Sequence, residues 1–477
     1  MAIEVMFSPE PSGTSRLRVL SRCVASTMLS LGPLTAVSGQ FAPYETTESN
    51  PEPTTLLETR VLPVAAPWQS PGTPTLPDWL ENGDNPTTSL ISPGLGTTIF
   101  GDSPLRPVTT VARRSGRGPS DPTLVPLGPL DVGFDLNYSM NYGTGLDARG
   151  NGSDTDGSST SFRHAVTPGI NLHAGDRWSV RYAPTANFYS AEGYQDTFDQ
   201  TVRLAGSASA PAWDFNLDHT TAISSTPLVE TGRQTDQTIH SSGVNAAWDL
   251  NGHDSLSFSL TQVLRFADDS PDSVSWSNQN WYDRPLSDHI TAGLGVGFGY
   301  NKMDPGTDMT SERLNARFQG RIGSKFTYSV SGGCELRQFL DTDASSKLSP
   351  LVAASVTYQV LKKTSFFASF DHTISTSYFT DQITENSSFQ GGITQVISPK
   401  WTASASGGYR SSDYQSATDT STSVRKDNTP FSNFTLSWRV LRRLTAAVSY
   451  SFRANSSDRV EFDFDSHQFG LRLNYSI

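Results

Sequence analysis

The sequence is poor in cysteine and has no long apolar run. It contains two cysteines in 477 residues, and Cys23 falls in the N-terminal leader described below. A processed chain then keeps Cys334 alone, which excludes an intrachain disulfide and a zinc site built from cysteines. No stretch approaches the roughly 18 consecutive apolar residues of a membrane-spanning helix, and the mean hydropathy is -0.38. A helical membrane bundle is excluded, but a barrel is not, because alternating strands average to a polar composition.

Positive charge is also scarce. Lys and Arg together number 35 against 47 Asp and Glu, and the formal net charge is -12. Nucleic-acid binding depends on basic patches, so no nucleic-acid partner is expected. Neither His-Glu-x-x-His nor Gly-x-Ser-x-Gly occurs in the chain. The sequence therefore predicts no catalytic residue, no metal site and no cofactor, and a protein that is not an enzyme.

Residues 1–39 are predicted to be a secretory signal peptide. Basic residues, the last of them Arg22, precede a modestly apolar run over 24–37, and small residues occupy 36–39. This order of basic, apolar and small segments is typical of a cleaved signal. Arg22 also occupies the position where a lipoprotein signal needs a small residue before its cysteine, so a lipid anchor is not expected. The alternative is a disordered N-terminal tail.

Residues 40–128 are predicted to be a disordered arm or linker. Most of the 29 prolines of the chain lie before residue 130, among Thr, Ser and Gly. Few segments there carry enough apolar residues to bury a core.

From residue 129 to the end, apolar and polar residues alternate. The pattern is clearest over 132–142 and over 467–477, where every second residue is apolar or aromatic. A period of two predicts strands with one apolar and one polar face. The last of these strands is about as long as a tilted strand that crosses a bilayer. Its apolar last residue, Ile477, is similar to the end of the closing strand in bacterial outer-membrane barrels.

Short and long connections alternate along this region. Eight short turns are predicted near residues 174, 210, 251, 285, 323, 362, 398 and 442, each between two long loops. Two interleaved sets of this kind imply about 18 antiparallel strands, an even count as in single-chain bacterial barrels. The predicted fold is therefore all-β, a single transmembrane antiparallel barrel over residues 129–477. The short turns are expected on the periplasmic side and the long loops outside.

Aromatic residues of the apolar face cluster beside the predicted short turns. A soluble sheet has no reason to hold aromatics at one end of its strands, whereas a membrane interface does. The predicted aromatic girdle comprises Trp178, Trp213, Trp248, Trp401 and Trp438.

The polar face carries charges of both signs, as expected for a water-filled lumen. Because the signs nearly balance, weak ion selectivity is expected; alternatively, the charges only pair with one another across the lumen. The predicted lumen-lining residues are Arg163, Arg181, Arg203, Arg313, Arg317, Arg337, Arg439, Arg472, Asp135, Asp214 and Glu335.

Four glycines on one strand face, Gly293, Gly295, Gly297 and Gly299, predict an inner wall without side chains. Their spacing is wrong for a nucleotide-binding loop. A bare wall leaves room inside the barrel, which suggests the hypothesis that the Pro-rich arm enters the lumen there.

The eight histidines do not suggest a metal site. His164, His219, His240, His372 and His467 fall near the long-loop ends of strands on the apolar face, and the others fall near short turns. Residues spread around a barrel cannot converge on one ion, so polar residues at a membrane interface are the better interpretation.

The region from 129 onward resembles outer-membrane β-barrel porin families of Gram-negative bacteria, in particular those found beside exopolysaccharide-secretion genes. The resemblance is carried by Asp135–Tyr138, Pro227–Asp236, Gly332–Gln338, Val448–Phe452 and Gly470–Tyr475. It implies passage of solutes, or of secreted polysaccharide, across the outer membrane.

The function predicted from these observations is a porin-like channel for passive passage of small hydrophilic solutes. The alternatives are a barrel that assists export of extracellular polysaccharide and a non-conducting surface or adhesive barrel. The expected location is the bacterial outer membrane, reached with a cleaved signal peptide. The expected partners are outer-membrane lipid, the barrel-assembly machinery acting on the C-terminal strand and, in the export alternative, polysaccharide.

Overall fold

The computed structural model describes residues 125–144, 160–190, 194–225, 227–228, 233–268, 270–340, 346–377, 379, 381–416 and 423–476. The predicted signal peptide, nearly all of the predicted arm and the terminal Ile477 lie outside these residues. Within the described ranges the helical structure is a single 3-10 turn, η1 (Val460–Phe462). No helix of this part of the chain has the length and apolar character needed to cross a membrane.

Nineteen strands form one sheet. One of them, β1 (Val125–Leu127), is a short addition beside the next strand, which leaves eighteen long strands of 12 to 17 residues. The long strands are β2 (Leu130–Thr144), β3 (Thr160–Ala174), β4 (Trp178–Tyr189), β5 (Thr197–Ala210), β6 (Trp213–Ser224), β9 (Gln237–Asp249), β10 (Ser255–Ala267), β11 (Asp272–Ser287), β12 (Ile290–Asp304), β13 (Met309–Ile322), β14 (Phe326–Phe339), β15 (Lys347–Leu361), β16 (Thr364–Thr376), β17 (Gln382–Ser398), β18 (Trp401–Ser416), β19 (Ser423–Arg439), β20 (Leu444–Ser457) and β21 (Phe464–Ser476). A separate two-residue pair, β7 (Pro227–Leu228) and β8 (Arg233–Gln234), lies between β6 and β9.

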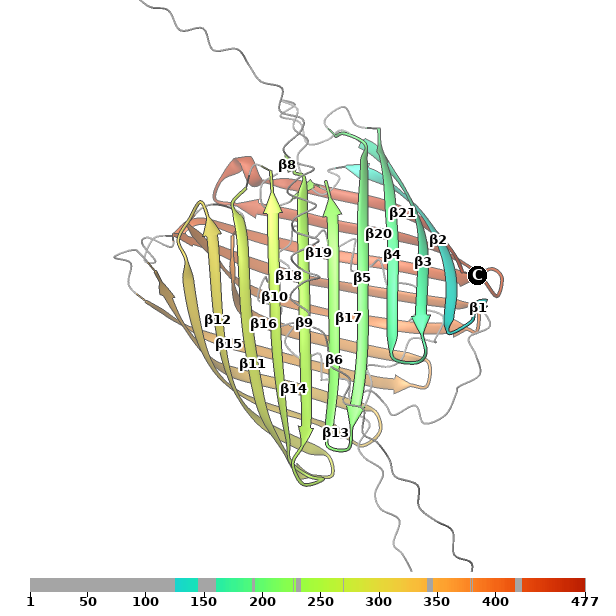
Figure 1. Ribbon diagram of the computed structural model, residues 1–477. Helices are drawn as coiled ribbons and strands as arrows, with labels where there is room; N and C mark the ends of the chain where they lie inside the picture. Colours follow the sequence, from blue (N-terminus) through green and yellow to red (C-terminus); the bar gives the residue numbers. More distant parts are fainter. Residues whose placement is uncertain are drawn as a thin grey trace, which may run out of the picture. The chain divides into compact units, whose positions relative to one another are not determined.

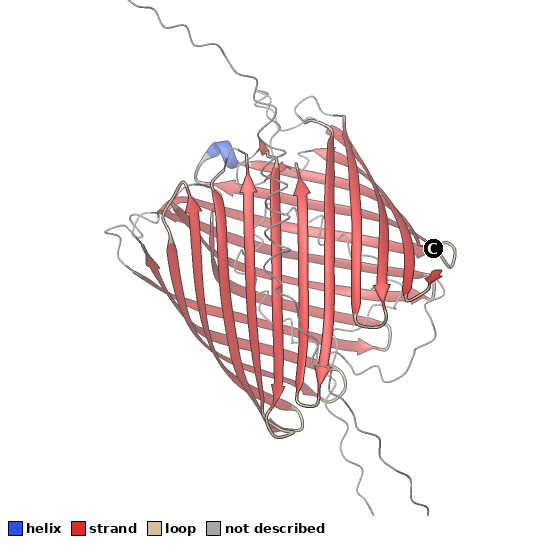
Figure 2. Cartoon of the chain, viewed as in Figure 1, coloured by secondary structure: helices blue, strands red, loops and turns tan. Residues whose placement is uncertain are grey.

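The sheet closes on itself, because β2 pairs with β3 on one side and with the last strand, β21, on the other. Each long strand pairs in antiparallel fashion with its neighbours in the chain, and Figures 1 and 2 show the resulting barrel. The predicted all-β barrel of 18 antiparallel strands is confirmed. The predicted alternation of short and long connections holds only in part, because the connections between β10 and β11 and between β12 and β13 have four residues each, whereas the predicted short turn between β9 and β10 has five. Left-handed glycines lie in three of the predicted short turns, Gly175, Gly252 and Gly323.

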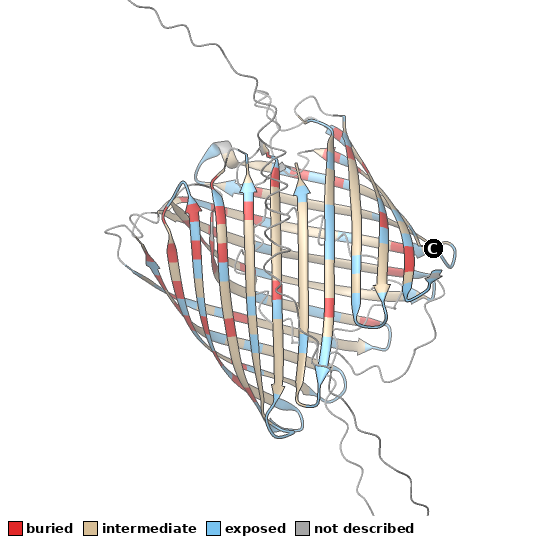
Figure 3. Cartoon of the chain, in the orientation of Figure 1, coloured by how far each residue is buried: buried red, intermediate tan, exposed pale blue. Residues whose placement is uncertain are grey.

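The two faces of the wall differ in chemistry. In β12, Leu294, Val296 and Phe298 are 64%, 47% and 60% exposed, whereas the residues between them are glycines. The same alternation recurs around the barrel (Figure 3). We call the face of exposed apolar side chains the outer face, and the other, polar face the inner face, because a closed sheet shields only its concave side.

Cross-strand pairing brings the predicted girdle residues together on the outer face. Trp213 lies opposite Trp248, with ring centroids 5.2 Å apart, and Trp401 lies opposite Trp438 at the same distance. Trp178 lies over Gly206, where a Cβ would come within 2.3 Å of the indole ring. These aromatic pairs border the short turns, at the end of the barrel opposite the long loops.

Candidate functional site

The candidate site is the inner face. Strand alternation places all of the predicted lumen residues on it, although they do not converge on one point. Arg203 lies directly opposite Arg181 in the next strand. Asp214 of β6 and Arg439 of β19 lie close to short turns. Six of the predicted residues form two groups of hydrogen-bonded side chains on separate parts of the wall, and Arg317 forms a third with Asp283. Arg472 lies on β21.

The first group is a buried ion triad on β13 and β14. The Glu335 carboxylate accepts hydrogen bonds from Arg313 Nε at 2.7 Å and from Arg337 Nε at 2.9 Å. Glu335 and Arg337 have side chains 1% exposed, and that of Arg313 is 6% exposed. The alternation places the three residues on one face, since Glu335 and Arg337 are two positions apart and Arg313 pairs with Glu335 across the strands.

The second group lies across the barrel on β2 to β5. Asp135 accepts hydrogen bonds from Arg181 Nη2 at 3.0 Å and from Asn171 at 2.8 Å. Farther along the same wall, Arg163 donates to Asn187 at 3.1 Å, and Asn187 donates to Asp199 at 2.8 Å. These contacts satisfy charges locally, within one wall.

A third pair covers the glycine face of β12. Arg317 of β13 reaches over Gly293 to Asp283 of β11, to which both its Nε, at 2.8 Å, and its Nη2 donate. The same guanidinium stacks on the indole of Trp281, 4.1 Å from the ring centroid. A Cβ on Gly295 would come within 2.6 Å of that indole.

The glycine wall is therefore covered, where the sequence suggested that it is bare. A Cβ on Gly293 would meet Asp283 at 2.3 Å, and one on Gly297 would meet Gln279 at 2.4 Å. The missing side chains let the neighbouring strands lay their own side chains flat against β12. Contact of the arm with this wall, as hypothesised from the sequence, lies outside the described residues.

Replacing Gly295 by alanine is expected to displace Trp281 and lower the free energy of unfolding by about 1–3 kcal/mol, the usual cost of overpacking. Tryptophan fluorescence during urea unfolding measures both effects. The matched control is Gly332→Ala, because a Cβ there would meet only Leu351 O, at 3.9 Å. Equal stability of the two variants would show that the position of the Trp281 indole does not depend on a glycine at residue 295.

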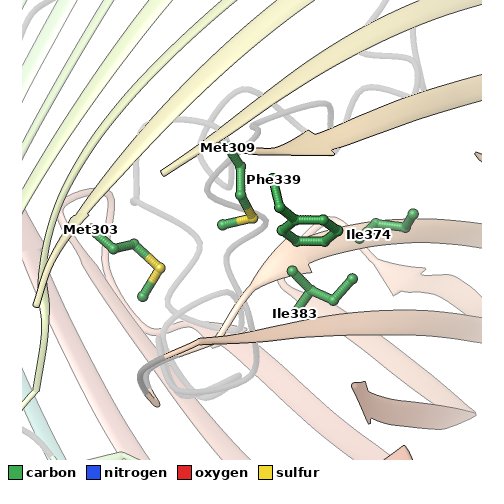
Figure 4. Packing of buried hydrophobic residues seen from close by; sticks show 5 residues of the cluster. All are labelled: Met303, Met309, Phe339, Ile374 and Ile383. Atoms are coloured by element: carbon green, nitrogen blue, oxygen red, sulfur yellow. The ribbon is translucent and has the colours of Figure 1, made fainter. Parts of the chain in front are cut away.

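The long-loop end of the barrel holds an apolar cluster that strand alternation does not predict. Met303, Met309 and Phe339 lie on the inner face of β12 to β14 and are 3%, 3% and 7% exposed. Ile374 of β16 and Ile383 of β17 complete the cluster at 2% and 0% exposure. Figure 4 shows Ile383 pointing toward Phe339, with Met309 and Ile374 beside the ring.

These two isoleucines belong to the outer face by alternation. Ile374 is in step with Phe370, which is 38% exposed, and Ile383 is in step with Phe389, which is 55% exposed. Their burial against the inner face of β12 to β14 requires the ends of β16 and β17 to bend into the barrel. We call the described residues of this segment, 374–377, 379 and 381–383, the inward hairpin.

Strand pairing supports the bend. The β15–β16 ladder ends at Val352 and His372, although β15 continues to pair with β14 as far as Lys347. Beyond that point Lys347, on the inner face of β15, donates to Glu385 of β17 at 2.8 Å. Glu385 is on the outer face by alternation, so the two meet because β16 and β17 have turned inward.

Two contacts hold the tip. The backbone N and the hydroxyl of Thr307, between β12 and β13, donate to the Asp381 carboxylate at 2.8 and 2.7 Å. On the other side, the Arg425 guanidinium lies 5.7 Å from the ring centroid of Phe379 and 3.8 Å from that of Phe462 in η1. The inward hairpin thus contacts the connection between β12 and β13 on one side and Arg425 of β19 on the other.

Sequence reasoning missed part of the inner face. Four residues of this face were not among those predicted from the sequence: Trp281 and Asp283 of β11, Arg410 of β18 and Arg425 of β19. β11 alternates poorly because Asn280 and Tyr282, on its outer face, are polar too. Arg410 and Arg425 occupy positions that strand alternation assigns to the inner face, so the alternation alone was sufficient to predict them.

Several buried inner-face groups have no hydrogen-bond partner among the described residues. Buried polar atoms usually have such partners, and here the partners would come from water or from parts of the chain outside the described residues. These groups are the side-chain amides of Gln237, Gln279 and Asn301 and the hydroxyls of Ser273, Ser275, Ser311 and Ser349. In the part of the chain that the structure describes, no three His, Cys, Asp or Glu residues are grouped to hold a metal ion.

The C-terminal part of the chain matches a known family. Residues 301–476 match the family described as Putative beta-barrel porin 2, which confirms the porin resemblance over these residues. No curated protein sequence matches the chain.

Solved structures with a similar fold include three outer-membrane proteins. OccK8 (OprE) of Pseudomonas aeruginosa is 10% identical with a TM-score of 0.39, over 73% of this chain and 98% of that one. OpdK of Pseudomonas aeruginosa with vanillate is 12% identical with a TM-score of 0.41, over 72% and 98%. A bacterial polysaccharide outer-membrane secretin is 8% identical with a TM-score of 0.32, over 72% and 98%.

Proposed function

Because residues 301–476 match a family described as Putative beta-barrel porin 2, we propose that the whole barrel is an outer-membrane channel for passive passage of small hydrophilic solutes. The observation that carries this proposal is the division of the closed wall into an apolar outer face and a polar inner face. Lipid tolerates a spanning sheet when every backbone group bonds within the wall, as closure through β2 and β21 allows. Water and polar solutes then meet a hydrogen-bonding surface inside.

The pairing of lumen charges supports weak ion selectivity. Glu335 neutralises part of the charge of Arg313 and Arg337, and Asp283 and Asp135 pair with Arg317 and Arg181. A lumen lined by such pairs presents donors and acceptors but no strong net field. Uncharged and weakly charged solutes are therefore the expected cargo.

The inward hairpin supports a size limit. An unobstructed 18-stranded barrel is wide enough for an aqueous channel. The apolar cluster and the Thr307–Asp381 contact hold the ends of β16 and β17 against β12 to β14, and we infer that these ends narrow the opening. Small solutes are expected to pass beside the hairpin and large ones to be excluded.

Delivery to the outer membrane requires a signal and an insertion route. The segment 1–39 is proposed as a cleaved signal, and β21 as the strand that the barrel-assembly machinery engages. β21 is the last strand and pairs with both β20 and β2, so it is the strand that completes the barrel.

Purified protein added to a planar lipid bilayer is expected to give steady single-channel steps. The reversal potential in a potassium chloride gradient should stay close to zero, because the lumen charges are paired. Protein unfolded by heat before addition is the control. A refolded barrel that inserts but stays silent would contradict the channel and favour a surface barrel. Block by added polysaccharide would favour an export role.

A further inference from the structure

The outer face carries a second polar and aromatic band, at the long-loop end. It contains His164, His219, His240 and His467, from β3, β6, β9 and β21. We call these four the histidine belt. Each is in step with exposed apolar residues of its own strand, such as Phe162 at 40% and Phe469 at 57% exposure. The belt therefore faces away from the lumen.

Each belt histidine is held by a hydroxyl through the same ring nitrogen. Nδ1 of His164 is 2.9 Å from the Tyr138 hydroxyl, and Nδ1 of His467 is 2.9 Å from the Tyr450 hydroxyl. The other two make the same contact at the same distance, His219 with Ser242 and His240 with Thr221. When a hydroxyl donates to Nδ1, the ring proton resides on Nε2.

The opposite nitrogen remains available in three of the four. Nε2 of His219 is 3.1 Å from the Thr221 hydroxyl. Nε2 of His164, His240 and His467 has no partner among the described residues. These three rings share one arrangement, in which Nδ1 contacts a hydroxyl of the wall and Nε2 is left toward the surroundings.

The height of the belt matches one border of the apolar band. Six positions separate Trp213 from His219, and eight separate His240 from Trp248. At about 3.3 Å per residue and a tilt near 40°, these spacings correspond to roughly 15–20 Å along the barrel axis. The apolar band of outer-membrane barrels is about 25 Å tall between its interfaces. If the tryptophans mark the periplasmic interface, the belt lies close to the outer one.

We propose that the histidine belt binds the phosphate groups of lipid headgroups in the outer leaflet. This inference rests on the proposed membrane location. A phosphate oxygen is a strong acceptor and complements a fixed N–H donor. Aromatic rings beside the histidines, such as Phe452 with its centroid 4.9 Å from that of His467, suit the apolar part of the same lipid at an interface.

The test uses the full chain in dodecyl maltoside, a detergent without phosphate, with added lipid A as the phosphate-bearing lipid. Native mass spectrometry counts the lipid that each barrel retains. The triple variant His164→Phe, His240→Phe, His467→Phe keeps the rings but loses the donors. It is expected to retain lipid about tenfold less well, the effect of losing roughly one charge-assisted hydrogen bond.

Two controls separate the sources of an effect. The triple variant His173→Phe, His253→Phe, His289→Phe removes three histidines at the short-turn end and is expected to retain lipid like the parent. Lipid A stripped of both phosphates should bind the parent no better than it binds the belt variant. Equal retention of intact and stripped lipid by the parent would overturn the proposal without any variant. Equal retention of intact lipid A by the parent and a folded belt variant would overturn it as well.

Bilayer conductance of the same preparations distinguishes a failure of this inference from a failure of the proposed function. Parent protein that conducts but shows no phosphate-dependent lipid binding would refute the belt and leave the channel standing. Protein that neither inserts nor conducts would refute the channel itself.

Discussion

Replacing Glu335 by glutamine is expected to make the pore prefer anions and to destabilise the barrel by about 3–5 kcal/mol, the usual cost of removing one partner from a buried ion cluster. Glu335 is fully buried and is the carboxylate shared by Arg313 and Arg337. Without it, two positive groups on the inner face lose their common counter-charge. The reversal potential in a salt gradient measures the selectivity, and urea unfolding followed by tryptophan fluorescence measures the stability.

The matched control is Asp214→Asn, which removes the same charge from the inner face. Asp214 is half-buried and lies near a short turn, with no buried guanidinium beside it among the described contacts. Its loss is expected to shift the reversal potential slightly and to leave stability unchanged. If both variants unfold at the same urea concentration, the triad does not hold β13 and β14 together.

Replacing Ile383 by aspartate is expected to release the inward hairpin and raise single-channel conductance several-fold. Ile383 is 0% exposed in the apolar cluster. A carboxylate has no partner there, and burying it unpaired is unfavourable enough to expel the segment. The barrel itself should survive, because β16 and β17 remain paired with each other and with β15 and β18 closer to the short turns.

Leu348→Asp provides the control for this variant. Leu348 lies in the adjacent strand β15 at the same end of the barrel and is 68% exposed, so the same chemical change touches no cluster. Its conductance should equal that of the parent. A second route to release is Thr307→Val, which removes the hydroxyl donated to Asp381. If Ile383→Asp folds and conducts like the parent, the hairpin does not limit the pore.

The fold could be predicted from the sequence because the pattern that indicates it is local. Alternation with a period of two marks each strand and assigns its two faces without knowledge of any neighbour. The regular exchange of short and long connections then implies the number of strands. Even weakly alternating segments, such as those that form β5, β11 and β17, were placed correctly because the turns on either side confine them.

The contact partners of each lumen residue could not be predicted from the sequence in the same way. Alternation places Arg317 and Asp283 on the inner face, but only the register of β11, β12 and β13 brings them together across Gly293. That register depends on how the whole sheet is staggered and closed, which is a long-range property. The covering of the glycine wall by Trp281 follows from the same register.

The inward hairpin could not be predicted from the sequence, because its residues do not follow the rule that alternate residues of a strand face opposite sides of the wall. Ile374 and Ile383 are outer-face residues by position and buried residues by contact. The sequence by itself determined an 18-stranded barrel with an apolar skin and a polar lumen, since those features follow from the period of the chain. Only the tertiary structure decided which charges pair and where two strands turn inward, since those features arise when distant strands meet and when the burial of five apolar side chains outweighs the regular course of two strands.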